Sequence, residues 1–471
     1  MKRKIWKRFI CVAFCVSLLA GVTGCATQTN KVEIEPMEAE ESPALSFDFI
    51  GGKDVMPVGG FFGPYTAAYS PNAQPLPDFY TDEYVSDIAK AGVNLIVYSP
   101  SDWTGEDGKK MMDLGAEHGV GVFVNDHSIY NMKGKDTELS LTEISEKMAE
   151  YRNHPAFCGM YLKDEPGGLT YWTKGPGENI DDYAPLADAL SECGVEYYTN
   201  LIRINTKDDT ENYEGYIEEY CEKLSPSFVC FDLYPFDDGN TRNIYLYNMA
   251  LIRDGAQRYN LPFWTYIAAG TYWDDDVKGI IAGEPKPLEG QFDWSINSAL
   301  AFGTQGLNYF MIIQPHYFSY TPEPDEFDFE RNGFFGARGN KNRWYFYAED
   351  IAKQIQAVDS VLMNSVSKGV IASGKEATTD VADCKNLVIK EGTWRELESV
   401  KGNTIVGCFN YQGKSAFYVV NHDCEYAQDI TLDFFDSYNL QVTQDGETKY
   451  VNTDSLALQM KAGDGALIVV E

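Results

Sequence analysis

Positive charge is scarce in this 471-residue sequence. It contains 38 Lys and Arg residues against 71 Asp and Glu residues, so its formal net charge is −33 at pH 7. A surface this acidic repels nucleic acids and polyanionic glycans. The composition therefore excludes nucleic acid as a partner and predicts a neutral or zwitterionic one.

Metal-binding patterns are also missing. The chain has only five histidines, none of them in an HxxxH pair, and it contains no CxxC motif. Zinc sites in proteins are usually built from such His and Cys spacings. We therefore predict no metal site, and the sequence indicates no organic cofactor and no obligate protein partner.

Long apolar runs are limited to one, from Ile10 to Val22, and five basic residues precede it. The run is too short for an ordinary membrane span and has the layout of a secretory signal. Val22-Thr23-Gly24-Cys25 then resembles a bacterial lipobox. We expect residues 1–24 to be a removed signal peptide and Cys25 to carry lipid, which predicts a lipid-anchored, extracytoplasmic protein of the bacterial cell envelope.

Removal of residues 1–24 takes away five basic and no acidic side chains, so the formal charge goes from −33 to −38. The following residues, 25–47, are polar, acidic and aperiodic, and we predict a flexible tether there. Cys11 and Cys15 are lost with the signal. Seven cysteines then remain besides Cys25, and an odd number cannot pair completely within one chain.

Short apolar segments recur through the first three quarters of the chain at intervals of roughly 25 to 45 residues, the spacing of strands joined by crossover helices. The predicted strands are Met56–Phe62, Val93–Tyr98, Val120–Val124, Phe157–Leu162, Glu196–Ile202, Phe228–Leu233, Pro262–Ile267 and Gly306–Ile312. Eight such units predict an α/β fold, a closed (β/α)8 TIM barrel over residues 48–364.

Helix signals lie between these strands. Thr81 is placed to cap a helix over Asp82–Ala91, and Ser140-Leu-Thr-Glu143 has the form of a capping box that opens a helix ending near Arg152. The stretch from Arg343 to Leu362 is predicted to be the eighth helix.

The last part of the chain, residues 365–471, has a different pattern. Short strand-like runs alternate with turn signals such as Gln444-Asp-Gly446, and no helical period is visible. This pattern predicts a small C-terminal all-β sandwich. We expect it to buttress the barrel, with sugar binding as the alternative role.

The most informative motif ends the fourth predicted strand. Phe157 to Leu162 is apolar, Asp164 and Glu165 follow, and Pro166 stops the strand. Two carboxylates at the end of a buried strand cost several kcal/mol unless they are paired or used. In TIM-barrel enzymes the active site lies at the carboxyl ends of the barrel strands. We therefore expect the pair to be functional.

Other strand ends carry side chains that suit sugar binding, because aromatic faces stack on sugar C–H groups while acids and amides bind hydroxyls. We predict that Asp232, at the end of the sixth strand, joins the two acids. The predicted substrate-binding residues are Tyr65, Trp103, Asn125, Asn200, Tyr234, Trp264, Tyr266, Gln314 and His316.

The passage from Asn153 to Pro166 resembles the corresponding part of retaining glycoside hydrolases with a (β/α)8 barrel. In that superfamily the proton donor ends strand four, which implies this role for Glu165. Asp232-Leu-Tyr234-Pro235 and the stretch from Gly303 to Phe310 are similar to its later strands. The resemblance covers most of residues 55–360, and a β-sandwich after the barrel also fits it.

The seventh strand departs from this family pattern. The large clan of such enzymes places a nucleophilic Glu there, but Phe263 to Gly270 contains no acid, and Asp274, Asp275 and Asp276 lie in the loop beyond. Two arrangements remain for the second carboxyl group.

In the first arrangement Asp232 is the second carboxylate and faces Glu165 at about 5 to 10 Å. In the second, Asp164 and Glu165 act as a unit, similar to the N-acetylhexosaminidase families, with Tyr234 or Tyr266 on the acetamido oxygen. Because neighbouring strand residues point to opposite faces, the second arrangement needs the strand to end or bulge by Asp164. We favour Asp232, with the alternative that it only pairs with Arg203 or Asn200.

These observations predict an extracellular glycoside hydrolase that acts on O-glycosidic bonds of neutral or N-acetylated glycans. Glu165 is its expected general acid/base. The alternative is a catalytically inactive surface lipoprotein that binds glycans.

Overall fold

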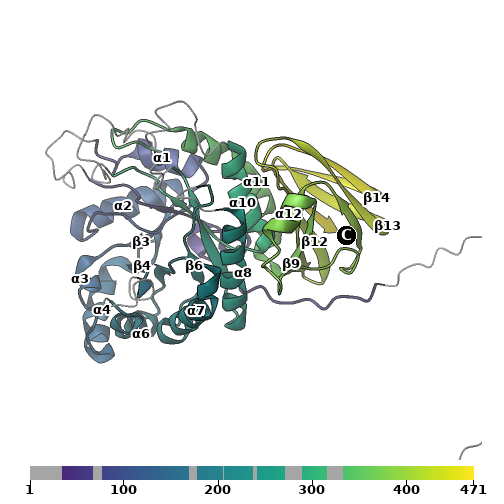
Figure 1. Ribbon diagram of the computed structural model, residues 1–471. Coiled ribbons are helices and arrows are strands. Elements are labelled where there is room, and N and C mark those ends of the chain that lie inside the picture. The colour runs from purple at the N-terminus through teal and green to yellow at the C-terminus, as the bar shows by residue number, and fades with distance from the viewer. Residues whose placement is uncertain are drawn as a thin grey trace, which may run out of the picture. The chain divides into compact units, whose positions relative to one another are not determined.

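The computed structural model describes residues 34–66, 77–168, 178–204, 206–236, 241–270, 289–315 and 332–471 (Figure 1). Cys25, His316 and Asp274 to Asp276, named above, lie outside these ranges. Residues 34–471 belong to one compact unit.

Eight parallel strands form the first part of this unit, and each is short, as is usual for a barrel. They are β1 (Val58–Phe61), β2 (Leu95–Ile96), β3 (Gly121–Val124), β4 (Phe157–Asp164), β5 (Tyr197–Asn200), β6 (Val229–Phe231), β7 (Phe263–Ala268) and β8 (Leu307–Phe310). Their order is β5-β4-β3-β2-β1-β8-β7-β6, and a parallel bridge between Leu201 and Phe231 joins the two ends. The predicted (β/α)8 barrel is confirmed.

Helices connect these strands. The described α-helices are α1 (Asp82–Lys90), α2 (Gly105–His118), α3 (His127–Tyr130), α4 (Thr137–Tyr151), α6 (Ala184–Glu192), α7 (Thr210–Leu224), α8 (Arg242–Arg258), α10 (Glu289–Phe302), α11 (Arg343–Met363) and α12 (Lys375–Asp380). Short 3₁₀ turns cover η1 (Asp48–Ile50), η2 (Gly52–Asp54), η4 (Ile180–Asp182) and η5 (Lys207–Asp209).

The sequence located one helix start well and another poorly. Thr81 caps α1 as predicted, its side chain accepting the backbone N–H of Tyr84. The predicted capping box at Ser140 is wrong, because α4 begins at Thr137 and Asp136 caps it by accepting the N–H of Leu139 at 2.9 Å. Ser140 lies buried inside the helix. Asp136, four residues upstream and of a type equally suited to capping, takes the role.

The C-terminal part is an antiparallel sheet whose strands run in the order β10-β13-β15-β12-β11-β9, with β14 paired to β13. Its strands are β9 (Ser365–Ser373), β10 (Leu397–Lys401), β11 (Thr404–Tyr411), β12 (Lys414–Asn421), β13 (Gln428–Gln444), β14 (Glu447–Met460) and β15 (Gly465–Val470). The pairing of β13 with β14 shifts register between Asp433 and Tyr438. An all-β region follows the barrel as predicted, with one short helix, α12, that the sequence did not indicate.

Two apolar layers hold this sheet. Its own core contains alternate residues of several strands, among them Val406, Phe417 and Leu432. The opposite face, including Tyr418 and Val420, belongs to the core of the barrel helices. Strands covered on both faces are apolar throughout rather than alternating, as β12 is.

Helix α10 lies between the barrel and this sheet. All its residues from Gln291 to Phe302 except Asp293 are buried. Tyr418 Oη donates to Asn297 Oδ1 of the helix at 2.7 Å. A helix that is buried all round needs neighbours on every side, so the sheet completes the packing of the barrel.

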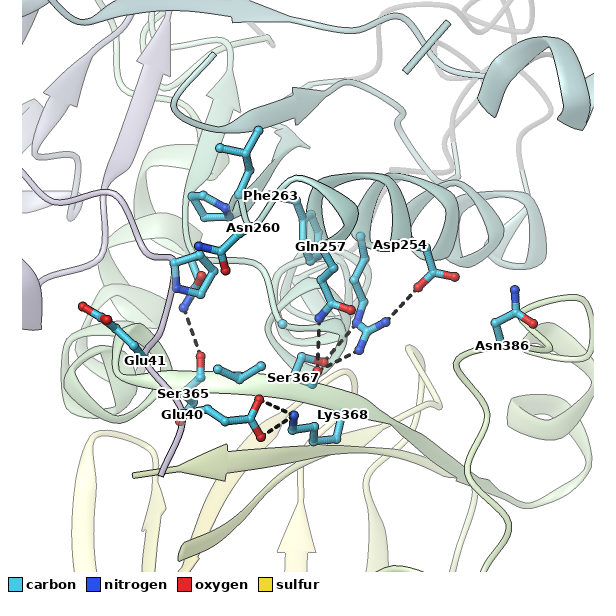
Figure 2. A pocket seen from close by; sticks show the side chains of 17 residues that line it. Glu40, Glu41, Asp254, Gln257, Asn260, Phe263, Ser365, Ser367, Lys368 and Asn386 are labelled. Carbon is cyan, nitrogen blue, oxygen red and sulfur yellow. Dashed lines mark hydrogen bonds and ion pairs between the residues drawn. The ribbon is translucent and has the colours of Figure 1, made fainter. Parts of the chain in front are cut away.

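The part of the predicted tether that is described, residues 34–47, does not behave as a free chain. Asn410 Nδ2 donates to the carbonyl of Glu38 at 2.8 Å, and Lys368 forms an ion pair with Glu40 at 2.6 Å (Figure 2). Gln305 Nε2 donates to Ser42 Oγ at 2.7 Å. Specific polar contacts thus hold this acidic segment against the body of the protein.

The seven cysteines of the described body are all free thiols, as their odd number required for at least one of them. No helix among the described residues is both long enough and apolar enough to cross a bilayer.

Candidate active site

A β-bulge in β4 places Asp164 in the barrel interior. Tyr161 pairs with Tyr198 of β5, but Lys163 then pairs with Thr199 and Asp164 with Asn200, so β4 has one extra residue there. Tyr161 and its partner Tyr198 point to the same face of the sheet. In a regular strand Asp164, three residues after Tyr161, would point to the opposite face. The bulge reverses this direction. It meets the condition under which Asp164 and Glu165 share one site.

The next residue, Glu165, has a left-handed backbone conformation with φ +50°. This conformation costs a residue with a Cβ of the order of 1 kcal/mol or more and is concentrated at functional sites. Here it ends the strand: Gly168 N donates to the Glu165 carbonyl at 3.0 Å in the turn that follows. The chain direction changes at the position where the carboxyl group is needed.

Asp232 reaches the same place from β6. Its backbone N–H donates to the carbonyl of Leu201 at 3.3 Å, which places it one residue above the bridge that closes the barrel. The side chains of Glu165 and Asp232 are in hydrogen-bonding contact. The carboxyl groups of Glu165 and Asp232 therefore face each other in one site, as the first of the two predicted arrangements requires.

The electrostatics of the three acids assign the proton. Burial is the largest cause that raises the pKa of Glu165, and the charges of Asp232 and Asp164 raise it further. Burial and the charge of Asp164 also raise the pKa of Asp232, but its hydrogen bond with Glu165 and the charge of Arg203 oppose this rise. Glu165 is thus the proton donor in the pair and Asp232 the acceptor.

Asp164 has a different environment. Burial raises its pKa, whereas the nearby Asn200 amide and Lys163 lower it. The amide does not form a good hydrogen bond, because Asn200 Nδ2 and Oδ1 are both buried without a hydrogen-bond partner among the described residues. Asp232 Oδ1 is likewise buried and without such a partner. Polar atoms left desolvated in this way are costly unless a ligand pairs with them.

Aromatic rings line the barrel beside the acids. The half-buried rings of Tyr98 and Tyr161 lie 4.6 Å apart, and Tyr234 stacks on Phe310 at 5.6 Å with an interplanar angle of 26°. The Asp164 charge acts directly on Tyr161, so this ring is next to the acids. Aromatic rings next to carboxyl groups suit the two kinds of surface of a sugar, its C–H faces and its hydroxyl groups.

Several predicted binding residues lie deeper in the protein. Trp264 is fully buried near the start of β7, where its ring stacks on Phe228 at 4.1 Å. A Cβ on Gly306 would come within 2.4 Å of that ring, so the two are packed tightly. Tyr266 is 2% exposed and its hydroxyl bonds to Tyr198. Both side chains are thus part of the packed barrel interior, although the charges of Asp164 and Asp232 still act on Tyr266.

The loops that follow β1, β2, β3 and β8 use their predicted residues internally. Tyr65 and Trp103 are fully buried. Asn125 Nδ2 donates to the carbonyls of Ser99 and Ser101, at 2.8 and 3.2 Å. Gln314 is 3% exposed. These residues shape the loops. Of the predicted set, Asn200 lies beside Asp164, Tyr266 lies within electrostatic range of Asp164 and Asp232, and Tyr234 follows Asp232 by two residues.

Some residues at the site were not predicted. Tyr98 and Tyr161 carry its aromatic surface, and Lys163, Lys133 and Glu178 form an ion-paired group at its edge. Alternation along β4 from Gly159 would have indicated that Tyr161 points inward. The ion-paired group joins segments far apart in sequence, so no local pattern signals it.

Other features of the described residues belong elsewhere. A cavity of about 470 Å³ opens near the start of β7 and β8 and is lined by Arg253, Gln257 and Glu40 among others (Figure 2). One group with metal-ligand geometry comprises Asp82, Glu117 and His118, whose ligand atoms lie within 4.8 Å of one another. Neither includes any of the three acids.

No protein-family model matches the chain, and no curated protein matches it in sequence. Its fold is similar to the crystal structure of a beta-galactosidase from Bacillus circulans sp. alkalophilus, with 10% identity, 88% of this chain and 99% of that chain covered, and a TM-score of 0.50. The catalytic domain of GH30 xylanase C from Talaromyces cellulolyticus aligns at 9% identity over 93% of this chain and 99% of that chain, with a TM-score of 0.42. The first likeness establishes the fold: a (β/α)8 barrel followed by an all-β region.

Proposed function

We propose that this protein is a glycoside hydrolase that cleaves O-glycosidic bonds of neutral or N-acetylated glycans. The contact between Glu165 and Asp232 is the observation that carries the proposal. It pairs Glu165, whose pKa burial and two neighbouring acids raise to about 10, with Asp232, whose pKa is raised less, to about 7, at the end of the barrel where TIM-barrel enzymes do their chemistry. A retaining glycosidase uses such a pair, one carboxyl group as acid and the other as nucleophile, and this supports the proposal.

In the first step the Glu165 hydroxyl donates its proton to the glycosidic oxygen as the bond to the anomeric carbon breaks. An oxygen of Asp232 forms a bond to that carbon, and the aglycone leaves as an alcohol. Negative charge passes to Glu165, where Arg203 lowers the cost of carrying it. The raised pKa keeps the proton available at neutral pH.

In the second step the Glu165 carboxylate takes a proton from water, and the water oxygen replaces Asp232 at the anomeric carbon. This route retains the anomeric configuration. Inverting enzymes hold their carboxyl groups roughly 6.5 to 9.5 Å apart so that a water fits between them. Retaining enzymes hold their carboxyl groups closer, about 5 to 5.5 Å apart, so the close approach of Glu165 and Asp232 favours retention over inversion.

Asp164 supports a second route. Because the bulge directs it inward, it is available to orient an acetamido group, with Glu165 as the acid and the substrate's own oxygen as the nucleophile. The buried Asn200 amide beside it offers one free donor and one free acceptor for such a group. This route requires an N-acetylated substrate, whereas the Asp232 route does not.

The charge of the site sets the substrate class. Among the described residues, the cations whose charge acts on Asp164, Glu165 and Asp232 are Arg203 and the ion-paired Lys163. Sugars that carry carboxylate or sulfate groups would meet net repulsion there. Neutral and N-acetylated sugars avoid it. With lipid at Cys25, the same site would act outside the cytoplasmic membrane, anchored to the cell envelope.

A panel of aryl glycosides that includes N-acetylhexosaminides tests this function. We expect hydrolysis of at least one by the wild-type protein. Glu165→Gln should lower kcat/KM by more than roughly tenfold on substrates with poor leaving groups, the low end for lost general-acid catalysis.

Glu196→Gln is the matched control for that experiment. Glu196 is also a carboxyl group whose pKa burial raises, but it precedes β5 at the opposite end of the barrel. It should leave kcat/KM unchanged. If the protein binds sugars saturably but hydrolyses none, and if Glu165→Gln does not change this binding, the protein is a glycan-binding protein and not an enzyme.

A further inference from the structure

The connection that follows β6 is held at both ends by one cluster, whose centre is the buried side chains of Trp294 and His422. Phe236, four residues after Asp232, lies edge-on to Trp294 of α10, with ring centroids 5.5 Å apart. At the other end, Arg242 begins α8 and its guanidinium lies 6.0 Å from the same Trp294 ring. Both ends therefore meet at one side chain.

The C-terminal sheet supplies the other half of this cluster. His422, which directly follows β12, is fully buried, and its carbonyl accepts Arg242 Nη1 at 2.7 Å. Asp380, the last residue of α12, accepts Arg242 Nε at 3.1 Å. Glu376 lies 3.3 Å from Arg242 Nη2. Three groups outside the barrel thus fix the first residue of α8.

The His422 ring links these contacts and has only one consistent tautomer. Trp294 Nε1 is 3.1 Å from His422 Nδ1, and an indole N–H can only donate, so Nδ1 carries no proton. The proton is then on Nε2, which donates to Asp380 at 2.8 Å. Burial lowers the pKa of His422 and favours this neutral form. The His422 ring therefore accepts a hydrogen bond from Trp294 and donates one to Asp380, which in turn binds Arg242.

We propose that the C-terminal sheet is a working part of the active site: His422 and Asp380 are positioning residues that, through Trp294 and Arg242, hold the chain after β6 and so hold Asp232 against Glu165. The inference rests on the proposed function for the role of Asp232. It assigns the sheet a catalytic purpose beyond packing.

The direct experiment is a carbon-13 NMR titration of the Asp232 carboxyl group in the purified protein, assigned with Asp232→Asn. Asp164, Glu165 and Arg203 face this group, and the Tyr216, Tyr266 and Cys230 side chains lie within its electrostatic range. Releasing the chain after β6 lets water reach Asp232. The titration midpoint in Arg242→Ala should therefore fall by about one pH unit towards the ordinary aspartate value.

Asp380→Asn is the second variant, because it removes the charge at almost constant volume and keeps the protein folded if Arg242→Ala does not. It should shift the midpoint in the same direction and lower kcat about tenfold with little change in KM, as expected for a misplaced catalytic group. Tyr418→Phe is the matched control. It removes another hydrogen bond between the sheet and α10, to Asn297, and should change neither the midpoint nor kcat.

The inference fails if folded Arg242→Ala and Asp380→Asn keep the wild-type Asp232 midpoint, or if Tyr418→Phe shifts it equally. The NMR readout does not need a substrate. A wild-type protein that hydrolyses nothing would therefore end the proposed function and still leave the positioning role to be decided by the midpoints. Turnover with unmoved midpoints would end only the positioning role.

Discussion

At the residue scale, Glu165 combines three costs at one position. It is held in a left-handed backbone conformation, it is desolvated, and it lies beside two other carboxyl groups. Each of these features lowers the stability of the fold, so stability does not explain why a glutamate occupies this position. Such a position is where a function for the side chain is to be sought.

Replacement of Glu165 should therefore stabilise the protein. A carboxyl group whose pKa is higher in the folded than in the unfolded state loses stability as pH rises above its unfolded value near 4.3. Gln does not titrate. We expect Glu165→Gln to raise the free energy of unfolding by about 1 to 2 kcal/mol at pH 7.5 and by much less at pH 4. Urea unfolding at the two pH values measures this.

Glu178→Gln provides the opposite sign. Its hydrogen bond to Lys133 lowers the pKa of Glu178, so its contribution is present above the unfolded pKa and is lost on acidification. This variant should be less stable than wild type at pH 7.5. A Glu165→Gln protein with the wild-type pH dependence would show that Glu165 is not a desolvated acid.

The sequence predicted the three acids because each follows an apolar strand. The sequence did not predict how far each side chain lies from the mouth of the barrel. Trp264 and Asp232 both lie near strand ends by number, but a shift of a few residues decides whether a side chain is in the packed interior or at the mouth. The bulge that turns Asp164 inward is a property of pairing with β5, which the sequence of β4 alone does not encode.

At the element scale, the start of α4 shows which of two candidate residues, Asp136 or Ser140, is the N-cap. Asp136 accepts a backbone N–H at 2.9 Å, while the buried Ser140 hydroxyl has no hydrogen-bond partner among the described residues. Asp136→Ala should lower stability by about 1 kcal/mol, the usual value of a lost N-cap. Ser140→Ala should be neutral or slightly stabilising. Thermal unfolding of the two variants measures this, and the reverse order would restore Ser140 as the cap.

The element pattern itself followed from periodicity, since all eight barrel strands and the capped start of α1 lie where the apolar segments indicated. Periodicity could not predict which element packs against each face of a strand. The residues of β12 are apolar on both sides because one face meets α10, and this is a tertiary fact.

At the scale of the whole molecule, the acidic segment that the sequence predicted to be a free tether is partly docked: its described residues contact the folded body. Its contacts with Lys368, Asn410 and Gln305 begin a short distance after Cys25 in the sequence. Composition predicted a free tether there, because an acidic, polar segment has no core to bury. Cationic and amide partners on the folded body supply the binding energy instead.

The lipid anchor is tested by metabolic labelling with a fatty acid in a bacterial host. We expect the wild-type chain to incorporate the label and to fractionate with membranes, and Cys25→Ser to do neither. Cys408→Ser is the control, because that thiol is buried in the sheet core and cannot be lipidated in the folded protein. Label that persists in Cys25→Ser would place the modification elsewhere.

The pairing of Glu165 with Asp232 is the central claim, and trapping of the glycosyl-enzyme tests it most directly. In a retaining enzyme, a 2-deoxy-2-fluoro glycoside of the sugar found in the aryl glycoside panel slows both steps, and an activated leaving group such as dinitrophenolate lets the first step proceed so that the glycosyl-enzyme accumulates. Mass spectrometry of the digested protein should then find the fluorosugar on the peptide that contains Asp232, and on no peptide of Asp232→Asn. Full turnover of ordinary substrate by Asp232→Asn, with no adduct on the wild-type peptide, would contradict the account.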